Sequence, residues 1–402
     1  MTKKSDAPAI RFKGFSDAWE QRKLGEIGSV SMCRRIFKEQ TSETGDIPFY
    51  KIGTFGADPD AFISRELFEE YKSKYPYPQK GDILISASGS IGRAVEFAGN
   101  NEYFQDSNIV WLNHDERLSN PFLKCFYSVV KWAGIEGSTI KRLYNDNILN
   151  TVICMPSVPE QKRIGLFFEN LDNLITLHQR KFEKLTNVKK SMLEKMFPQN
   201  GSSYPEIRFK GFTDPWEQRK LGDIADIVGG GTPSTGNQSY WDGDIDWYAP
   251  AEIADQIYAN SSQKKITGLG YENSSAKMLP PGTVLFTSRA GIGKTAILTR
   301  KGCTNQGFQS IVPHRGELDS YFIFSRTEEL KRYGELVGAG STFVEVSGKQ
   351  MAVMELMMPP TMREQQTIGG FFQQLDHLIT LHQRELEKLQ NIKKSMLEKM
   401  FV

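Results

Sequence analysis

Two stretches of the chain repeat apolar residues at alternating spacings of three and four, the pattern of a helix with one buried seam. We predict helices over residues 159–197 and 363–402, because neither stretch contains glycine or proline after its first turns. Each helix would have about 38 residues and a length of roughly 57 Å. The first seam consists of Ile164, Phe168, Leu171, Ile175, His178, Phe182, Leu185, Lys189, Met192 and Met196, and the second of Ile368, Phe372, Leu375, Ile379, His382, Leu386, Leu389, Lys393, Met396 and Met400.

A single helix with such a seam would expose a long apolar stripe to water, so we expect the two helices to pair with each other. His178 and His382 occupy the same position of the two seams. They could be metal ligands, but no cysteine lies one turn away on the same face. Polar residues that set the register of a coiled coil are therefore the favoured interpretation.

The blocks before the two helices consist of short β-rich runs separated by Gly, Pro, Asn and Ser, which predicts β-rich domains. Gly81–Phe97 aligns without a gap onto Gly282–Leu298, and both have the pattern of strand, tight turn and strand. Ile47–Tyr50 likewise matches Ile245–Tyr248. We infer that the two blocks are one fold with different surface residues.

The segments that flank the blocks are almost identical. Residues 10–27, IRFKGFSDAWEQRKLGEI, recur at 207–224 as IRFKGFTDPWEQRKLGDI, and both predicted helices contain the sequence KKSMLEKMF near their ends. The chain is thus a tandem repeat with two divergent interiors between constant flanks. The near-identity of the flanks indicates that they contact a common partner or each other, while each interior recognises something different.

Charge and cysteine content exclude few classes of function. The 402 residues include 50 Lys and Arg against 48 Asp and Glu, a net charge of +2, so the chain lacks the overall charge of a nucleic-acid binder but could hold a basic face. Four cysteines without a CxxC spacing favour lone buried thiols over disulfides or zinc. The start has no apolar signal core and no run approaches the length of a membrane span, so we expect a soluble, cytoplasmic protein.

Gly291–Thr295, with the sequence GIGKT, resembles the end of a phosphate-binding P-loop. Ser288 stands where that motif requires glycine, and the first block has Arg93 and Ala94 in place of the lysine and threonine. We therefore predict a β-hairpin turn with glycines at positive φ and a basic tip. Catalytic motifs such as GxSxG or HExxH do not occur in the sequence.

Basic, amide and hydroxyl side chains in the turns of both blocks have the chemistry that reads DNA. Arginine recognises guanine, Asn and Gln recognise adenine, and Ser, Thr and Lys contact bases or phosphates. The candidates are Arg93, Gln105, Asn108, Thr139 and Lys141 in the first block, and Thr232, Ser234, Tyr248, Arg289, Lys294, Asn305, Gln306, Gln309 and Thr342 in the second. We expect no catalytic, cofactor-binding or metal-binding residue in this chain.

Together these features closely resemble the specificity subunit of type I restriction-modification systems. The resemblance rests on two variable blocks, each followed by a near-identical helix with an LDxLITLHQR core at 171–180 and 375–384. The flank FKGF(S/T)DxWEQRKLG, the GGGTPS turn at 229–234 and the NQGF segment at 305–308 also look like this family. The first block differs, because it carries Ser29–Arg34 where the second has the GGGTPS turn.

The resemblance implies an α+β fold with two target-recognition domains, 1–158 and 198–362, and two conserved helices, 159–197 and 363–402, that pair as an antiparallel coiled coil with pseudo-two-fold symmetry. Each domain would read one half of a bipartite, asymmetric site in double-stranded DNA, and the helices would set the gap between the halves. Two modification (methyltransferase) subunits and the restriction (motor-nuclease) subunits would be partners. S-adenosylmethionine, ATP and Mg would belong to those partners and not to this chain.

Two other classes of function stay open. A structural scaffold would use only the coiled coil, which leaves two β-rich blocks with unlike surfaces unexplained. A nucleotide hydrolase built on Gly293 and Lys294 would bind nucleotide, and a binding measurement on the purified chain would detect it.

Overall fold

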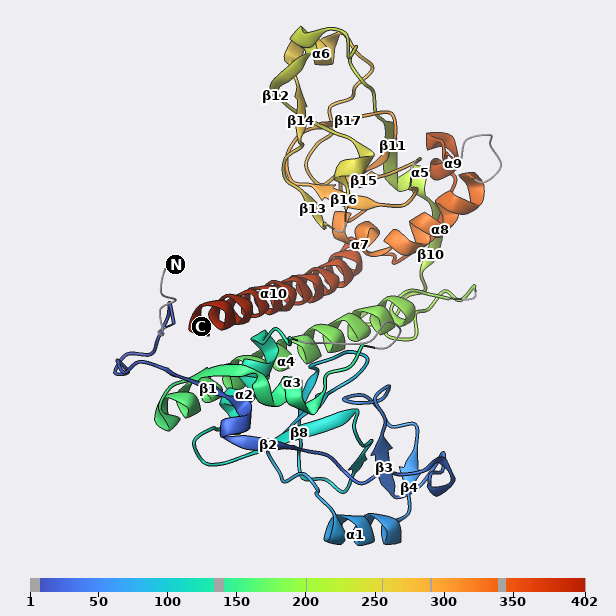
Figure 1. Cartoon of the computed structure of the whole chain (residues 1–402). Coiled ribbons are helices and arrows are strands. Elements are labelled where there is room, and N and C mark those ends of the chain that lie inside the picture. Colours follow the sequence, from blue (N-terminus) through green and yellow to red (C-terminus); the bar gives the residue numbers. More distant parts are fainter. Residues whose placement is uncertain are drawn as a thin grey trace. The chain divides into compact units, whose positions relative to one another are not determined.

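The structure is a computed structural model that describes residues 8–133, 141–199, 201–254, 256–289, 291–338 and 345–401. The chain forms two compact units, one of residues 1–179 with 384–402 and the other of residues 180–383. Each unit contains one β-rich block, the first half of the long helix that follows that block, and the last half of the other long helix (Figure 1).

The first unit, hereafter unit 1, is built on three sets of strands. Its strands are β1 (Glu20–Lys23), β2 (Gly28–Ser31), β3 (Ile47–Tyr50), β4 (Phe62–Ile63), β5 (Ile83–Ser86), β6 (Ala94–Glu96), β7 (Tyr103–Phe104), β8 (Ile109–His114) and β9 (Val152–Met155). Its helices are α1 (Arg65–Lys74), α2 (Asn120–Val129), α3 (Asn145–Asn150) and the first half of α4 (Val158–Lys195). The strands form sheets of order β2-β8-β5-β6 and β4-β3-β7, and a separate pair β1-β9.

The second unit, hereafter unit 2, repeats this plan. Its strands are β10 (Glu217–Lys220), β11 (Ala225–Gly229), β12 (Trp241–Tyr248), β13 (Tyr258–Ala259), β14 (Lys264–Ile266), β15 (Val284–Phe286), β16 (Thr295–Leu298), β17 (Cys303–Thr304), β18 (Gln309–Pro313) and β19 (Glu355–Met358). Its helices are α5 (Leu221–Ile224), α6 (Gly268–Glu272), α7 (Ser320–Ser325), α8 (Thr327–Gly338), α9 (Gly348–Ala352) and the first half of α10 (Met362–Met400). The sheets have orders β11-β18-β15-β16-β13 and β14-β12-β17, beside the pair β10-β19.

The strand pairings confirm that the two blocks share one fold. The aligned hairpins form antiparallel pairs, β5 with β6 and β15 with β16. The second aligned segment pairs in parallel in both units, β3 with β7 and β12 with β17. Unit 2 differs by one added edge strand, β13, which pairs with β16.

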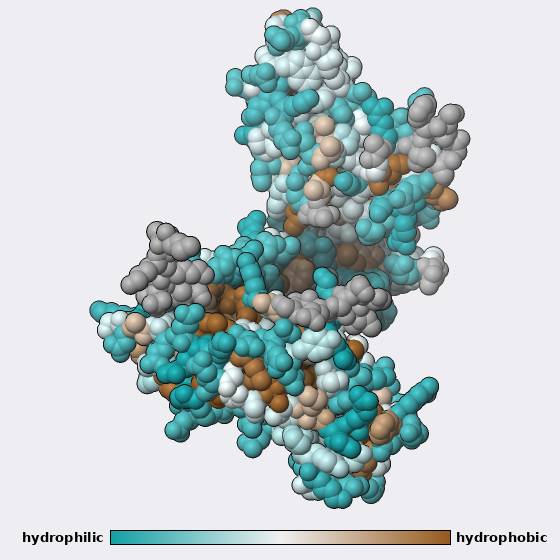
Figure 2. Space-filling model, viewed as in Figure 1, coloured by the Kyte–Doolittle hydropathy of each residue, from teal (hydrophilic) through white to brown (hydrophobic). Residues whose placement is uncertain are grey.

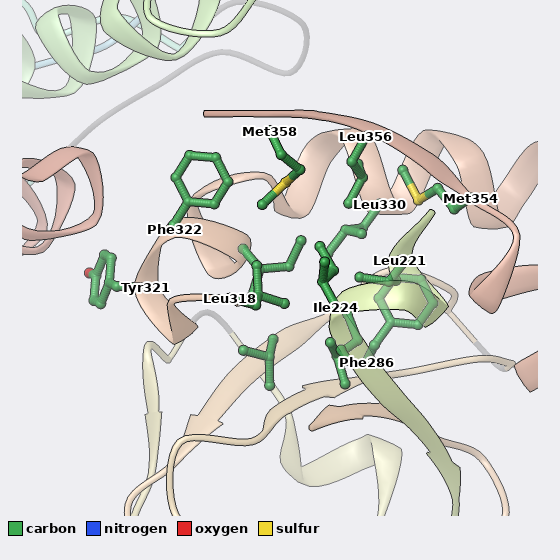
Figure 3. Packing of buried hydrophobic residues seen from close by; sticks show 14 of the residues in the cluster. Leu221, Ile224, Phe286, Leu318, Tyr321, Phe322, Leu330, Met354, Leu356 and Met358 are labelled. Atoms are coloured by element: carbon green, nitrogen blue, oxygen red, sulfur yellow. The ribbon is translucent and has the colours of Figure 1, made fainter. Parts of the chain in front are cut away.

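Apolar side chains from the sheet, the flank and the helices fill the core of unit 2 (Figure 3). Leu221 follows β10, Phe286 ends β15, Leu330 lies on α8, and each is fully buried. Burial of one such side chain stabilises the fold by about 1.5–3 kcal/mol. This core therefore fixes the constant flank on the variable block, so that the block can change its surface without losing its support.

The long helices bury the seam that their sequences predict. Within unit 1, Ile164 and Phe168 of α4 share a core with Leu397 and Met400 of α10, and Lys393 pairs with Asp172 at 2.5 Å. The first half of one helix thus meets the last half of the other, which is an antiparallel arrangement.

Unit 2 repeats this arrangement with the roles of the helices exchanged. Phe372 and Leu375 of α10 share a core with Met196 of α4, and Lys189 pairs with Asp376 at 2.5 Å. The family resemblance implies domain limits at 158, 197 and 362, whereas the compact units divide both helices near their middles. The reason is that the end of each helix contributes its apolar residues to the core of the other block.

The constant flanks contact the helices within each unit, which confirms one of the two alternatives that the sequence left open. The Arg11 guanidinium donates two hydrogen bonds of 2.7 Å to the carboxylate of Glu160, and the backbone N–H of Ile10 donates to the carbonyl of Lys399. In unit 2, Arg208 binds Glu364 in the same bidentate way, at 2.7 and 2.8 Å. The flanks are therefore part of the scaffold.

One glycine near the start of each long helix allows a close approach to the block. A Cβ atom added to Gly165 would lie 2.4 Å from Cβ of Pro121, and one added to Gly369 would lie 2.6 Å from Oδ1 of Asp319. These distances are too short for any side chain, so the two glycines are required by packing and not by helix propensity.

The seam histidines and the cysteines are candidate metal ligands or disulfide partners. His178 and His382 are half-buried on the seams, and the described part of the chain contains no cluster of His, Cys, Asp or Glu that could hold a metal. None of the four cysteines forms a disulfide, and three of them are buried. Within the residues described, no helix is both long enough and apolar enough to cross a membrane.

Candidate nucleic-acid interface

The hairpin between the two central strands of each block is built in the same way in both units. The Ser86 hydroxyl donates to the Ser90 carbonyl and accepts the Arg93 N–H. Thr287 makes the equivalent bonds, donating to the Gly291 carbonyl at 2.7 Å and accepting the Lys294 N–H at 2.9 Å. The hydroxyl thus closes the turn from inside, and the basic residue is left at its rim.

Gly92 and Gly293 complete the two turns. Their φ angles of +81° and +96° lie in the left-handed region that favours glycine. An added Cβ would lie 2.5 Å from Nε1 of Trp132 in unit 1 and 2.3 Å from Cγ of Lys331 in unit 2. The GIGKT sequence is therefore a turn between two β-strands, as predicted, and not the strand-to-helix loop of a P-loop.

Three motifs that lie far apart in the sequence meet beside this hairpin. In unit 1, the N–H of Ala87 donates to the Asn108 carbonyl, and the Ala87 carbonyl accepts the N–H of Leu143, both at 2.8 Å. An isolated β-bridge also pairs Ser88 with Arg142. The hairpin is thus held between the segment around Asn108 and the segment that follows residues 137–139.

Unit 2 forms the same three-part cluster. The N–H of Ser288 donates to the Gly307 carbonyl at 2.8 Å, and the Ser288 carbonyl accepts the N–H of Val346 at 3.0 Å. Arg289 forms an isolated β-bridge with Glu345. The hairpin, the NQGF segment and the segment after 340–342 therefore converge, and the distances between them could not be predicted from the sequence.

The loop after the first strand of each larger sheet also reaches this cluster. In unit 2 the Thr232 hydroxyl of the GGGTPS turn donates to Oε1 of Gln306, and the Gly231 N–H donates to the Thr304 carbonyl at 2.8 Å. In unit 1 the corresponding contact is an ion pair of 2.9 Å between Arg35 and Asp106. Sequence reasoning missed Arg35, because the first block lacks the GGGTPS signature that marks this loop.

The amide candidates use their oxygen atoms inside the protein. Oε1 of Gln105 accepts the Ile52 N–H at 2.9 Å, and Oδ1 of Asn305 accepts the Gly307 N–H at 2.8 Å. Oδ1 of Asn108 accepts from the Ser88 hydroxyl at 2.8 Å and from Arg142 at 3.1 Å. An amide oxygen can accept two hydrogen bonds, so bonds within the protein occupy it fully only at Asn108, while Gln105 and Asn305 each keep one acceptor site that a base could use. In this structure all three amide oxygens hold the loops.

The basic candidates lie at the surface of the same clusters. Lys141 and Lys294 are exposed, and Arg289 is half-buried. Arg93 is exposed, and its guanidinium donates to the Gly56 carbonyl at 2.9 Å. Long cationic side chains in these positions can reach a phosphate or a base edge.

The other candidates differ in accessibility. Ser234 is exposed at the end of the GGGTPS turn, and Gln309 is half-buried on β18. The prediction that Tyr248 contacts DNA is wrong, because its side chain is 1% exposed in an apolar core and cannot touch DNA in this conformation. Burial raises the pKa of its hydroxyl to about 12. Thr139 and Thr342 lie outside the described residues.

Comparison with known proteins identifies the architecture. The family model described as the type I restriction modification DNA specificity domain matches residues 16–187 and again residues 213–391. A type I restriction enzyme specificity subunit of Haemophilus influenzae is 60% identical over 157 residues, which are 38% of this chain and 41% of that protein. A specificity subunit of Methanocaldococcus jannaschii is 25% identical over 399 residues, which are 94% of this chain and 92% of that protein.

A solved structure shows the same fold. The S subunit of a type I restriction-modification system from M. genitalium superposes with a TM-score of 0.65 at 14% identity, over 98% of this chain and 99% of the other. The alignment with the Haemophilus relative spans about two fifths of that protein, whereas the family model covers both repeats of this chain. The chain therefore belongs to the family of type I restriction-modification specificity proteins and carries two copies of their DNA specificity domain.

Proposed function

We propose that this chain is the DNA sequence-recognition subunit of a type I restriction-modification complex. Each β-rich block reads one half of a bipartite, asymmetric site, and the paired helices set the spacing and dock the methyltransferase subunits. The observation that carries the proposal is the contrast between a scaffold that is nearly identical in the two units and a hairpin cluster whose side chains differ. Identical supports with different reading surfaces are what a non-palindromic, interrupted site requires.

The test is the pattern of DNA methylation in cells. With the cognate modification subunits present, the chain should direct adenine methylation to one bipartite motif, and the motif should vanish when the chain is deleted. Exchange of residues 226–358 for the block of another family member should replace one half of the motif and leave the other intact. Simultaneous change of both halves would contradict the proposal.

The chain itself is proposed to be non-catalytic. The GIGKT segment forms a β-turn, and its lysine lies at the rim of the hairpin, exposed to solvent. Purified chain should therefore neither hydrolyse ATP nor methylate or cut DNA. S-adenosylmethionine, ATP and Mg would act in the modification and restriction subunits. Turnover of ATP that Lys294→Ala abolishes would favour the nucleotide hydrolase instead.

A duplicated surface supports the docking of two modification subunits. A groove of about 550 Å³ in unit 1 is lined by Arg384, Glu387, Lys388, Asn391, Ile392, Ser395 and Met396 of α10. A groove of about 520 Å³ in unit 2 is lined by Arg180, Glu183, Lys184, Asn187, Val188, Ser191 and Met192 of α4. The two linings are identical except for one exchange of valine and isoleucine.

Exposed positions of a helix tolerate most substitutions, so their identity between the repeats needs a cause outside the fold. Lys184 and Lys388 are exposed in these grooves. Leu177 and Leu381 lie on the same two helices outside the groove linings, with 46% and 45% of their surface accessible. Hydrophilic side chains cover most of the face of the molecule seen in Figure 2, so exposed leucines at equivalent positions of two helices are unusual. One partner that binds twice explains both features.

Native mass spectrometry tests this docking. The wild-type chain with excess modification subunit should form a complex with two copies of that subunit. Lys184→Glu alone and Lys388→Glu alone should each leave one copy bound, and the double variant should leave none. Glu70→Lys on α1, outside both grooves, is the control. Retention of two copies in both single variants would place the docking surface elsewhere.

The spacing role has its own test. Insertion of one heptad after Leu185 and one after Leu389 keeps the seam and lengthens each helix by about 10 Å. Since B-DNA rises about 3.4 Å per base pair, the preferred gap in the methylated motif should grow by about three base pairs. Methylation with the original gap and unchanged efficiency would show that the helices do not measure the distance.

A further inference from the structure

In both units, the hairpin forms one isolated β-bridge with the segment that faces it, and one residue of that bridge is an arginine. We call this bridged pair of residues the rung of the hairpin cluster. The arginine lies on opposite sides of the rung in the two units. In unit 1 the rung consists of Ser88 on the hairpin and Arg142 on the facing segment. In unit 2 it consists of Arg289 on the hairpin and Glu345 on the facing segment. We propose that Arg142 is a specificity-determining residue that reads a guanine in the half-site of the first block, an inference that rests on the proposed function.

The surroundings of Arg142 fix the direction of its side chain. Its Nη2 donates to Oδ1 of Asn108 at 3.1 Å, and the same oxygen accepts the hydroxyl of Ser88 at 2.8 Å. Ser88 is only 5% exposed, so this small polar network lies at the base of the cluster and not on its rim. Asn108 therefore acts as a positioning residue whose amide oxygen is already occupied by two donors.

Among the described residues, no group occupies the remaining donors of Arg142: its guanidinium makes no other hydrogen bond and no ion pair with them, and the side chain is half-buried. The planar guanidinium presents N–H groups in a fixed fork, which matches O6 and N7 of guanine. A base contact needs such a fixed fork, whereas a phosphate contact is satisfied by a mobile charge.

The neighbouring residues are better suited to phosphate. Lys141 and Arg93 are exposed, and neither is held at the rung of the hairpin cluster. Because successive residues of an extended segment point to opposite sides, the bridge that brings Arg142 to Ser88 turns Lys141 the other way. This alternation of side chains assigns the base contact to Arg142 and an electrostatic contact with phosphate to Lys141.

The experiment uses the full chain co-expressed with its cognate modification subunits, and the adenine-methylation motif is read from genomic DNA. Arg142→Gln, Arg142→Lys and Arg142→Ala are compared with wild type. Arg142→Gln keeps a donor for Asn108 and, because glutamine prefers adenine, should replace one guanine of the first half-site by adenine. Modification of the wild-type motif should fall by about 5- to 150-fold in all three variants, with the second half-site unchanged.

The controls separate the possible failures. Arg65→Ala removes an exposed arginine of the same unit that pairs with Asp46, and it should leave the motif unchanged. Arg289→Ala should alter only the second half-site. Thermal melting of each purified variant, together with an intact second half-site in its motif, shows that the chain is folded.

Two results would overturn the inference while leaving the proposed function intact. The first is an unchanged motif at full efficiency in Arg142→Ala. The second is equal weakening at all sites in Arg142→Ala with recovery in Arg142→Lys, since that behaviour belongs to a phosphate contact. A wild-type chain that directs no bipartite motif would overturn the proposed function, and this inference with it.

Discussion

The buried ion pair between the flank and the second long helix gives the sharpest prediction about stability. The two carboxylate oxygens of Glu364 accept hydrogen bonds from Nε and Nη2 of Arg208, at 2.7 and 2.8 Å. The first of these oxygens also accepts a hydrogen bond of 3.2 Å from Nε1 of Trp216. The side chains of Glu364 and Arg208 are 1% and 13% exposed. Glu364→Gln keeps the shape of the side chain but leaves the guanidinium without its counter-charge.

Removal of one partner of a buried ion pair costs about 3–5 kcal/mol. Since Arg208 keeps some contact with water, we expect the lower end, about 3 kcal/mol. For a unit of this size that loss lowers the melting temperature by about 6–12 °C. Calorimetry, with urea unfolding followed by tryptophan fluorescence, measures the effect, and Glu160→Gln should produce the same effect in unit 1.

Two further variants control this reasoning. Glu70→Gln removes the exposed ion pair of Glu70 with Lys74 on α1, which should change the stability by less than about 0.5 kcal/mol. Replacement of Arg208 by methionine together with Glu364 by leucine should recover most of the loss, because apolar groups of similar volume remove the uncompensated charge. A loss below about 1 kcal/mol for Glu364→Gln would refute the view that the flank is anchored by this pair.

Three more outcomes test the fold. Gly369→Ala should lower the free energy of unfolding by about 1–3 kcal/mol in urea titrations, since the added methyl overlaps the start of α7, and no change would contradict the packing. Lys189→Asp should destabilise the chain, and the exchanged pair Lys189→Asp with Asp376→Lys should recover part of the loss in a double-mutant cycle. Burial raises the pKa of Asp246, but hydrogen bonds from Ser262 and an ion pair with Arg300 outweigh it, so that pKa lies below its ordinary value. Its contribution is complete above about pH 4 and is lost as the pH falls toward the lowered folded-state pKa, so Asp246→Asn should weaken the acid sensitivity seen in melting curves.

The helical periodicity could be predicted from the sequence because it depends only on residues close together in the chain. The repeat could be detected because two segments can be compared directly. The seams from Ile164 to Met196 and from Ile368 to Met400 need only the spacing of one helical turn, and every seam position is buried or half-buried in the structure. The glycine-bearing hairpins were predictable for the same reason, since a tight turn is decided by its own few residues. The family resemblance, the tandem repeat and the hairpin turns could therefore be predicted from the sequence alone.

The reading surface depends on which segments meet and in which register. Asn108 and Gln105 have suitable side chains, but only the tertiary structure shows that hydrogen bonds inside the protein already use their oxygen atoms. Tyr248 has the right chemistry and lies in a core. Lys141 and Arg142 are adjacent in the sequence, and a bridge of one residue decides which of them faces the hairpin, because a shift of one position moves a side chain to the other face of a strand. The pairing of segments that are far apart in the sequence decides which residue faces the hairpin. No local pattern in the sequence predicts this pairing.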